Sequence, residues 1–209
     1  MHVEQLERTG ADAILVTEEI FQSFDRPQGF FPCDTPVAGF RLLVGTRERA
    51  PSPKFDAYVV MTSGSTGKPK AIRFPAAQLD QLVKWHLDSL PEAHRMAQLS
   101  SLMHDVAYHE IYATLAGGRT LVFAESKLRL SPGALASFVN EMELDRIYLP
   151  TVLLEGVANA ALVQNLPCRD LRMVIVAGGT LEISDNIRRW FAKTGATLVN
   201  TMACQKPRT

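Results

Sequence analysis

The chain of 209 residues has few cysteines, no excess of either charge and no long apolar run. Its three cysteines, Cys33, Cys168 and Cys204, are an odd number and form no CxxC pair, so neither a disulfide framework nor a cysteine zinc site is indicated. The five histidines show no HExxH or similar ligand spacing. We therefore expect no metal site built on cysteine or histidine.

The charges balance, with 22 Lys and Arg residues against 22 Asp and Glu residues. A chain without net positive charge has no global field to attract polyanions, so we expect neither nucleic acid nor an anionic membrane as a partner. Residues 1–16 carry acidic side chains and lack the basic start and apolar run of a signal peptide, and no stretch approaches the ~20 apolar residues of a membrane span. The expected location is the cytoplasm.

Strand patterns alternate with helical patterns from residue 57 to residue 200. Strands are expected at 57–63, 96–102, 119–124, 145–150, 171–179 and 196–200, and helices at 75–90, 110–117, 132–144, 151–162 and 183–195. The almost wholly apolar run 171–179 is typical of a strand that is covered on both faces. This alternation predicts an α/β fold with a parallel sheet flanked by helices.

The two ends of the chain are less regular. A helix near 2–9 and a strand at 11–17 are expected, followed by a loop rich in Pro and Phe up to about residue 40. Residues 201–209 have no periodicity and complete no further element. With 46% hydrophobic and 21% charged residues, the chain resembles one ordinary globular domain without an internal boundary.

The loop after the first strand of this series is rich in hydrogen-bond donors. Residues 62–67 read TSGSTG, and small residues leave their backbone N–H groups open to an anion, while Lys68 and Lys70 add positive charge. The loop is not a P-loop, because GxxxxGK[ST] would need Gly at position 62 and Ser or Thr at position 69. The alternative is a flexible surface loop, but a strand before it and two lysines after it favour an anion site between a strand and a helix.

Residues 58–70, YVVMTSGSTGKPK, resemble the phosphate-binding signature of the adenylate-forming superfamily of acyl-CoA synthetases, luciferases and peptide-synthetase adenylation domains. Residues 104–123, HDVAYHEIYATLAGGRTLVF, are similar to a segment of the peptide-synthetase branch. The stretches 147–153 and 171–181 resemble its next two strand ends. The resemblance runs from about residue 5 to residue 200 and implies a partial N-terminal core of an adenylate-forming enzyme.

The resemblance assigns the nucleotide contacts. It places the ATP phosphates on Thr62, Ser63, Gly64, Ser65, Thr66, Gly67 and Lys70. It places the backbone of Gly178 and Gly179 beside the adenine, where glycine permits close approach; a plain turn between strand and helix is the alternative, and both can hold. Mg²⁺ is implied together with ATP, but the glutamate that usually holds it has no counterpart here, so neither a metal ligand nor a catalytic residue is assigned.

The resemblance also assigns a substrate pocket. Asp105 matches the acidic residue that pairs with the α-ammonium group of an amino acid, and a helix N-cap is its alternative role. The remaining pocket positions are Val106, His109, Tyr148, Ile175 and Ala177. Their mixture of polar and apolar side chains indicates a pocket that is not purely aliphatic.

The implied function is ATP-dependent activation of an amino acid as an aminoacyl-adenylate, with a carrier-protein domain as partner. One alternative is a non-catalytic nucleotide-binding remnant of a broken gene. Another is a fragment of an acyl- or aryl-acid CoA ligase, which Asp105 disfavours because a carboxylate would repel a substrate without an amine. The family's lid lysine and ribose-binding aspartate have no counterpart, so turnover by residues 1–209 alone is not expected.

The last residues depart from the family pattern. The family usually continues N-x-Y-G-x-x-E, whereas Asn200 is followed by TMACQKPRT. Reading the codons of residues 202–208 one base earlier forces a glycine and allows Tyr, Glu and Thr in the order Y-G-x-x-E-T. We therefore expect a truncated adenylation core at 1–200 and a frameshifted tail at 201–209.

Overall fold

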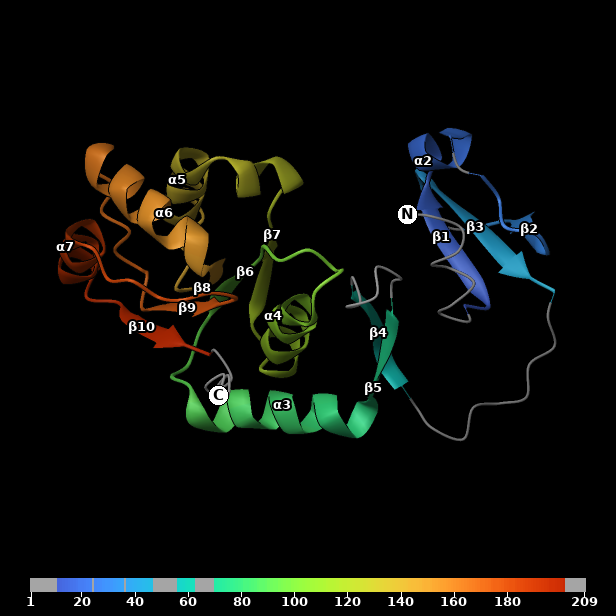
Figure 1. The fold of residues 1–209 in the computed structure, drawn as a ribbon, viewed down its shortest axis with the longest axis horizontal. Coiled ribbons are helices and arrows are strands. Elements are labelled where there is room, and N and C mark those ends of the chain that lie inside the picture. The colour runs from blue at the N-terminus through green and yellow to red at the C-terminus, as the bar shows by residue number, and fades with distance from the viewer. Residues whose placement is uncertain (1–10, 24, 36, 47–55, 63–69, 202–209) are drawn as a thin grey trace, which may run out of the picture. The chain divides into compact units, whose positions relative to one another are not determined.

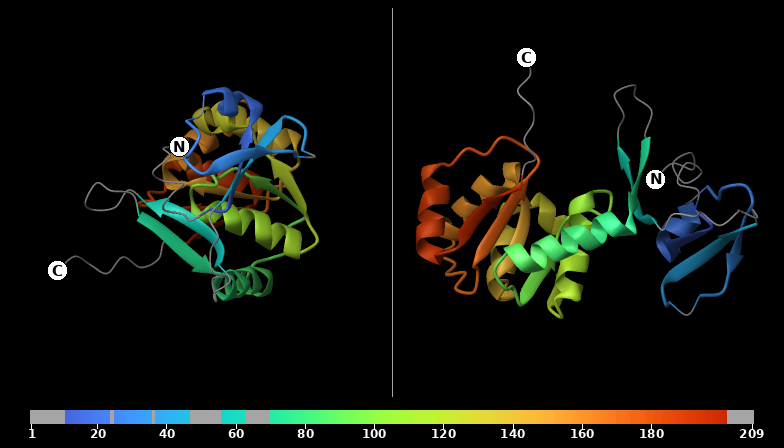
Figure 2. Two further views of the ribbon diagram at one scale, coloured as in Figure 1. Left: turned by 90° about the vertical axis from the view of Figure 1, so that its right-hand side faces the viewer. Right: turned by 90° about the horizontal axis from the view of Figure 1, so that it is seen from below.

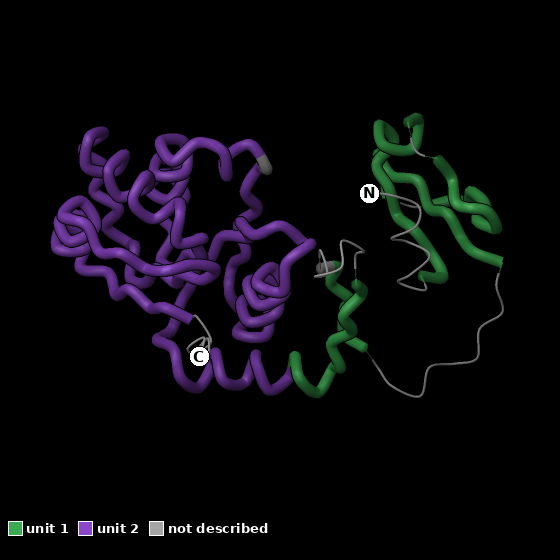
Figure 3. Tube along the Cα trace, in the orientation of Figure 1, with its two compact units in different colours: residues 1–79 green, residues 80–209 purple. Residues whose placement is uncertain are grey.

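The computed structural model describes residues 11–23, 25–35, 37–46, 56–62 and 70–201. The chain forms two compact units, residues 1–79 and residues 80–209 (Figure 3). The sequence offers no sign of this boundary, because no change of composition marks it. The expected helix at 2–9 and nearly all of the expected tail lie outside the described residues.

The first unit begins with a small antiparallel sheet of strand order β1-β3-β2. Its elements are β1 (Ala13–Thr17), α2 (Glu18–Ser23), β2 (Phe30–Cys33) and β3 (Phe40–Gly45). The strand expected at 11–17 is confirmed as β1, but the loop expected up to about residue 40 is wrong. The missed elements are short, and their order depends on pairing with β3 and on a core of Ile14, Val16 and Leu43, which local periodicity does not report.

A second antiparallel pair follows, made of β4 (Asp56–Thr62) and β5 (Lys70–Pro75). The expected order of strand, loop and helix is wrong here, because β5 lies between the loop and α3 (Ala76–Ser89). β5 is recognisable only through its partner: its backbone pairs with β4 from Thr62 and Lys70 onwards, and Tyr58 stacks on Phe74 with ring centroids 4.7 Å apart. The donor-rich loop therefore connects two antiparallel strands.

The second unit is built on a five-stranded sheet of order β10-β9-β8-β6-β7, in which every pair is parallel (Figure 1). Its strands are β6 (Arg95–Gln98), β7 (Thr120–Phe123), β8 (Arg146–Pro150), β9 (Met173–Ala177) and β10 (Thr197–Asn200). Each of them falls on an expected strand. The predicted α/β fold with a parallel sheet is thereby confirmed.

Helices cover both faces of this sheet (Figures 1 and 2). One face carries α5 (Pro132–Glu141), α6 (Thr151–Val163) and α7 (Asp185–Thr194), and the other carries the later part of α3 and α4 (Asp105–Ala116); a short 3₁₀ helix spans Ser126–Leu130. The expected start of α4 at 110 is wrong: the helix begins at Asp105, where Ala107 is fully buried and Val106 packs against the cluster that contains Tyr148 and Ile175. Within the described residues, no helix is long and apolar enough to cross a membrane.

The sheet core follows the two-residue period of its strands. Ile147, Leu149, Val174 and Val176 lie in the large cluster with α5, α6 and α7. The alternate residues of the same strands point to the other face, where Tyr148 and Ile175 form a second cluster with Met96 and Met173. The strand register therefore decides which side chains of β8 and β9 face α4.

The ends of two helices are set by local sequence. The Ser131 hydroxyl accepts from the Ala134 N–H, with Pro132 in the first turn of α5. The Ser184 hydroxyl caps α7 in the same way by accepting from the Ile187 N–H. α7 ends at Thr194 and is followed by its C-cap Gly195, whose φ of 71° lies in the left-handed region that favours glycine.

Two valines of α6 provide a matched test of the large cluster. Val157 is 0% exposed and Val152 is 83% exposed. Val157→Ala should lower the free energy of unfolding by about 2 kcal/mol, since it leaves a cavity between the helices and the sheet. Val152→Ala makes the same change in the same helix and should alter it by less than about 0.5 kcal/mol. Urea denaturation measures both, and equal effects would contradict the assigned faces of α6.

Candidate functional site

Two cavities lie at the carboxyl ends of β8 and β9, where open parallel sheets commonly bind ligands. The first, the α3-side cavity, has a volume of about 560 Å³. It is lined by Leu82, Trp85, Asp105, Val106, His109, Ala177, Gly178, Val199, Asn200 and Thr201. Side chains of α3, α4 and the ends of two strands thus converge on it.

The second, the β8-side cavity, has a volume of about 490 Å³ and is mainly apolar. Its lining residues are Leu99, Ser100, Ser101, His104, Asp105, Val106, Arg129, Tyr148, Leu149, Pro150, Leu153, Ala177 and Gly178. Asp105, Val106, Ala177 and Gly178 line both cavities. These four residues form a rim that the two cavities share, and we call it the shared rim.

The structure brings most of the expected substrate pocket together. Besides the shared rim, His109 lines the α3-side cavity and Tyr148 lines the β8-side cavity. Ile175 differs: it is fully buried in the cluster with Tyr148 and is not among the lining residues of either cavity. It lies beneath the pocket, and Val106 packs against its cluster.

The two glycines after β9 differ in their surroundings. Gly178 has a φ of +92°, a conformation that L side chains rarely adopt, and it belongs to the shared rim. Gly179 lines neither cavity, and a Cβ there would lie 2.6 Å from the Thr151 hydroxyl oxygen at the start of α6. Close packing of the turn alone explains glycine at position 179, whereas Gly178 also borders space that a ligand can occupy.

Asp105 is the first residue of α4, and its carboxylate accepts from the Val106 N–H at 2.9 Å. The N-cap position is His104, whose side chain makes no capping hydrogen bond. The Asp105 carboxylate thus lies one residue after the cap, at the positive end of the helix dipole and on the shared rim. Cap-like support of the helix and contact with a ligand are compatible there.

The expected phosphate loop is only partly described. Thr62 ends β4 and pairs with Lys70 at the start of β5. Ser63, Gly64, Ser65, Thr66 and Gly67 lie outside the described residues. The assignment of this loop to ATP phosphates therefore stays a prediction.

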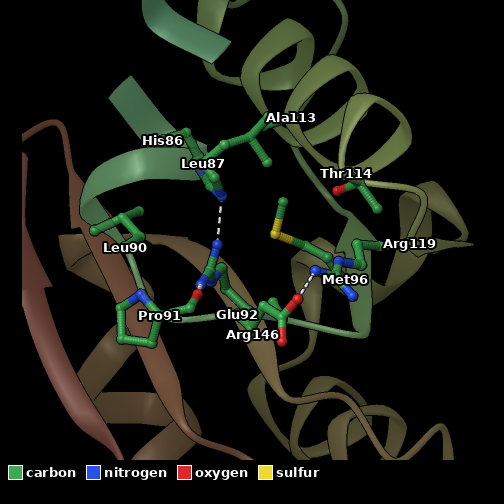
Figure 4. A pocket seen from close by; sticks show the side chains of 11 residues that line it. His86, Leu87, Leu90, Pro91, Glu92, Met96, Ala113, Thr114, Arg119 and Arg146 are labelled. Carbon is green, nitrogen blue, oxygen red and sulfur yellow. Dashed lines mark hydrogen bonds and ion pairs between the residues drawn. The ribbon is translucent and has the colours of Figure 1, made fainter. Parts of the chain in front are cut away.

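Four polar side chains form a buried hydrogen-bonded network beneath the pocket. His86 Nδ1 lies 2.9 Å from His109 Nε2, and the Tyr148 hydroxyl oxygen lies 3.3 Å from Nδ1 of each histidine. Arg146 contacts His86 Nε2 through Nη1 and the Pro91 carbonyl oxygen through Nη2 (Figure 4). All four side chains are buried and satisfy one another in part, since Arg146 Nε makes no hydrogen bond among the described residues.

This network keeps both imidazoles neutral. Burial, with His109 and Arg146 nearby, lowers the pKa of His86 from 6.5 to about 3. Burial and Arg146 lower the pKa of His109 from 6.5 to about 4, although Asp105 opposes this shift. Burial also raises the pKa of Tyr148, so its hydroxyl stays protonated at neutral pH.

A buried carboxylate holds the strand end at the β8-side cavity. Glu110 is 0% exposed and accepts from the backbone N–H groups of Leu99 and Ser100 and from the Ser100 hydroxyl. Burial raises its pKa to about 7, although these hydrogen bonds favour the ionised form. Arg129 donates to the Leu99 and Ser100 carbonyl oxygens, so the backbone beyond β6 is held by two ionisable side chains, Glu110 and Arg129.

The sequence reasoning missed His86, Glu110, Arg129 and Arg146 as members of the site. Glu110 lies inside the stretch 104–123 that carries the family resemblance, which was the available signal. His86 and Arg146 gave none, because their partners are far away in the sequence. In the described part of the chain, no group of three His, Cys, Asp or Glu side chains could hold a metal ion.

A family model described as AMP-binding enzyme matches residues 5–204. The chain belongs to the AMP-binding enzyme family. Its relatives include the nonribosomal peptide synthetase kk1B of Curvularia clavata, 35% identical over 147 residues. Tyrocidine synthase 2 of Brevibacillus parabrevis is 26% identical over 166 residues. These matches cover 68% and 76% of this chain but only 1% and 5% of the relatives.

Solved structures of this family share the fold. The nonribosomal peptide synthetase FmoA3 in its AMPPNP-bound form has a TM-score of 0.77 at 24% identity, covering 96% of this chain and 22% of that one. The Vibrio cholerae adenylation domain AlmE, in complex with glycyl-adenosine-5'-phosphate, has a TM-score of 0.60 at 27% identity, covering 71% and 28%. The expected peptide-synthetase branch of the adenylate-forming superfamily is confirmed. The domain limits, the tail and the cytoplasmic location stay predictions.

The buried network of this AMP-binding chain predicts destabilisation by acid. Because His86 and His109 have lowered pKa values, the unfolded chain binds more protons between about pH 3 and 6.5, and stability falls as pH falls through this window. Glu110 acts oppositely, since its raised pKa stabilises the fold below about 4.5 and this stability is lost as pH rises through about 7. The two histidines outweigh the one carboxyl, so the unfolding free energy should fall by roughly 1 kcal/mol between about pH 6.5 and 5.5.

Urea denaturation at several pH values measures this slope. His86→Gln should flatten it, whereas His94→Gln, at an exposed position, should leave it unchanged. Stability that rises steadily on acidification would contradict neutral, buried histidines.

Proposed function

We propose that the chain contributes the substrate site of an enzyme that activates an amino acid with ATP, forming an aminoacyl-adenylate. The observation that carries the proposal is the position of Asp105 on the shared rim of two cavities, at the carboxyl edge of a parallel sheet. The glycine turn after β9 borders the same space. A carboxylate and an accessible backbone thus lie next to volume sufficient for a small ligand.

The chemistry of Asp105 favours an amine. Asp105 is exposed on the rim, and a ligand that covers it would have to supply a cationic partner, because a desolvated carboxylate without one is costly. The α-ammonium group of an amino acid supplies this charge. An acyl or aryl acid offers only a second carboxylate, which Asp105 would repel.

In the proposed reaction the amino-acid carboxylate attacks the α-phosphorus of ATP and pyrophosphate leaves. Asp105 orients the amine, and the rim at Ala177 and Gly178 positions the substrate between the two cavities. Donors of the loop at 62–67 and Lys70 would stabilise charge on the phosphates, an assignment that rests on the family resemblance alone. Mg²⁺ would accompany ATP, as the family resemblance implies.

The relatives also support amino-acid activation with ATP. The AlmE structure contains glycyl-adenosine-5'-phosphate, an aminoacyl-adenylate, and the FmoA3 structure contains the ATP analogue AMPPNP. The curated relatives named above are peptide synthetases, which favours transfer of the activated amino acid to a carrier-protein domain. The chain covers a small fraction of those proteins, so it would supply one part of such an enzyme.

Binding of two stable adenylate mimics tests the proposal without requiring turnover. Alanyl-sulfamoyl adenosine carries the amine, and its propionyl counterpart lacks it. The alanyl compound should bind about tenfold more tightly, since an ion pair with Asp105 contributes roughly 1.5 kcal/mol. Asp105→Asn should remove this preference by weakening the alanyl compound alone, as measured by isothermal titration calorimetry.

Lys70→Ala is the reciprocal control. It should weaken ATP while leaving the amine preference unchanged, because the mimics lack the β- and γ-phosphates that Lys70 is proposed to contact. Equal binding of the two mimics would contradict the amino-acid assignment and favour an amine-free acid. Failure of both mimics and ATP to bind would contradict the proposed function as a whole.

A further inference from the structure

Arg146 determines which atom donates and which atom accepts in each hydrogen bond of the buried network beneath the pocket. A guanidinium group has five N–H donors, no acceptor and a pKa too high to lose its charge in a protein. Arg146 Nη1 faces His86 Nε2, so this nitrogen must accept (Figure 4). A neutral His86 therefore carries its proton on Nδ1.

The proton on His86 Nδ1 determines the donor and acceptor atoms of the next hydrogen bonds as well. His86 Nδ1–H donates to His109 Nε2 at 2.9 Å, which makes Nε2 the acceptor and places the His109 proton on Nδ1. His109 Nδ1–H then donates to the Tyr148 oxygen at 3.3 Å. Each tautomer is thus determined by Arg146, which lies two histidines away from Tyr148.

The Tyr148 hydroxyl has one hydrogen-bonding function, donation of its proton, that the network does not use. Its oxygen accepts from His109 Nδ1–H and shares the His86 Nδ1–H at 3.3 Å, so both lone pairs are engaged. Neither histidine nitrogen that faces it can accept its proton. Across the described residues, the Tyr148 hydroxyl makes no hydrogen bond beyond these two, and Tyr148 lines the β8-side cavity. The hydroxyl hydrogen thus has no acceptor among the described residues, and a ligand in the cavity could supply one.

We infer that Tyr148 is a specificity-determining donor, and that His86 and Arg146 are positioning residues that hold it in this role. The site then selects amino acids whose side chain ends in a neutral hydrogen-bond acceptor, such as an amide or a hydroxyl. This inference rests on the proposed function, because it concerns the side chain of a substrate whose amine is bound by Asp105.

The network disfavours the charged alternatives. A lysine-like ammonium group offers only donors and would meet a donor whose lone pairs are occupied, near the Arg146 charge. A carboxylate could accept from Tyr148, but burial would require a paired cation. Both Arg146 Nη atoms are engaged, by His86 and by Pro91, so Arg146 has only its Nε–H left without a partner and offers a carboxylate no bidentate pair. An aliphatic side chain would leave the Tyr148 donor buried without a partner.

The first experiment reads the tautomers directly, without any ligand. Two-bond ¹H–¹⁵N spectra of the histidine rings should show His86 and His109 as single, neutral Nδ1–H tautomers. Arg146→Met removes the donor that imposes them and should give mixed tautomers. Arg119→Met is the matched control, because Arg119 and Arg146 both line a third cavity, of about 200 Å³, but Arg119 pairs with Glu92 outside the network (Figure 4).

The second experiment measures selectivity with isosteric sulfamoyl adenosines. The asparaginyl probe should bind at least about fivefold more tightly than the leucyl probe, and the glutaminyl probe likewise against the homoleucyl probe. Aspartyl and lysyl probes should bind more weakly than the amides. Tyr148→Phe keeps the ring but removes the donor, so both ratios should fall to about one while binding of the leucyl probe is retained.

The outcomes separate this inference from the proposed function. Nε2–H tautomers in the wild-type chain would overturn the network, whatever binds. Equal binding of amide and aliphatic probes, or preference for the aspartyl or lysyl probe, would overturn the inferred substrate class while amino-acid activation stands. If Arg146→Met fails to fold, the wild-type tautomers and the Tyr148→Phe ratios still decide the question. Absence of binding by every probe would overturn both.

Discussion

The burial of β8 on both faces is the constraint on which the site depends. Arg146, Ile147, Tyr148 and Leu149 are all buried, although two of them carry polar groups. A buried polar group without a partner costs ~1–3 kcal/mol, so Arg146 and Tyr148 need partners inside the protein. α3 and α4 supply His86 and His109, and this requirement joins the helical layer to the sheet beneath the pocket.

The two-residue period of the strands places different side chains on the two faces of the sheet. Residues of β8 and β9 that face α5, α6 and α7 are aliphatic and form the large cluster, whereas the alternate residues lie under the cavities. The same alternation separates stability from specificity: Ile147 and Val174 contribute to the core, and Tyr148 contributes to the pocket. Glu110 and Arg129 then hold the strand end after β6, so the β8-side cavity is bordered by backbone with little freedom.

Much of the sheet could be predicted from the sequence because its strands are apolar runs separated by helices with clear periodicity. The elements that were predicted wrongly have a common cause. β5 and β3 are defined by pairing with other strands, and the first turn of α4 packs through Val106 and Ala107 against distant parts of the chain, which the sequence does not report. The motifs pointed to Asp105, Val106, Ala177 and Gly178, which line both cavities and whose binding roles stay predictions, whereas nothing in the sequence pointed to His86 and Arg146, 60 positions apart. A hydrogen-bond network across that separation becomes visible only in three dimensions.

The dependence of both histidine tautomers on Arg146 has a consequence for how such a pocket can diverge. If position 146 held an acceptor in place of a guanidinium group, His86 would carry its proton on Nε2, His109 would follow, and Tyr148 would donate inward. The hydroxyl would then offer the ligand a lone pair instead of a proton. One substitution at a residue that never touches the ligand would invert the chemical preference of the pocket and leave its shape unchanged. Divergence of specificity in this fold therefore need not pass through the residues that line the cavity.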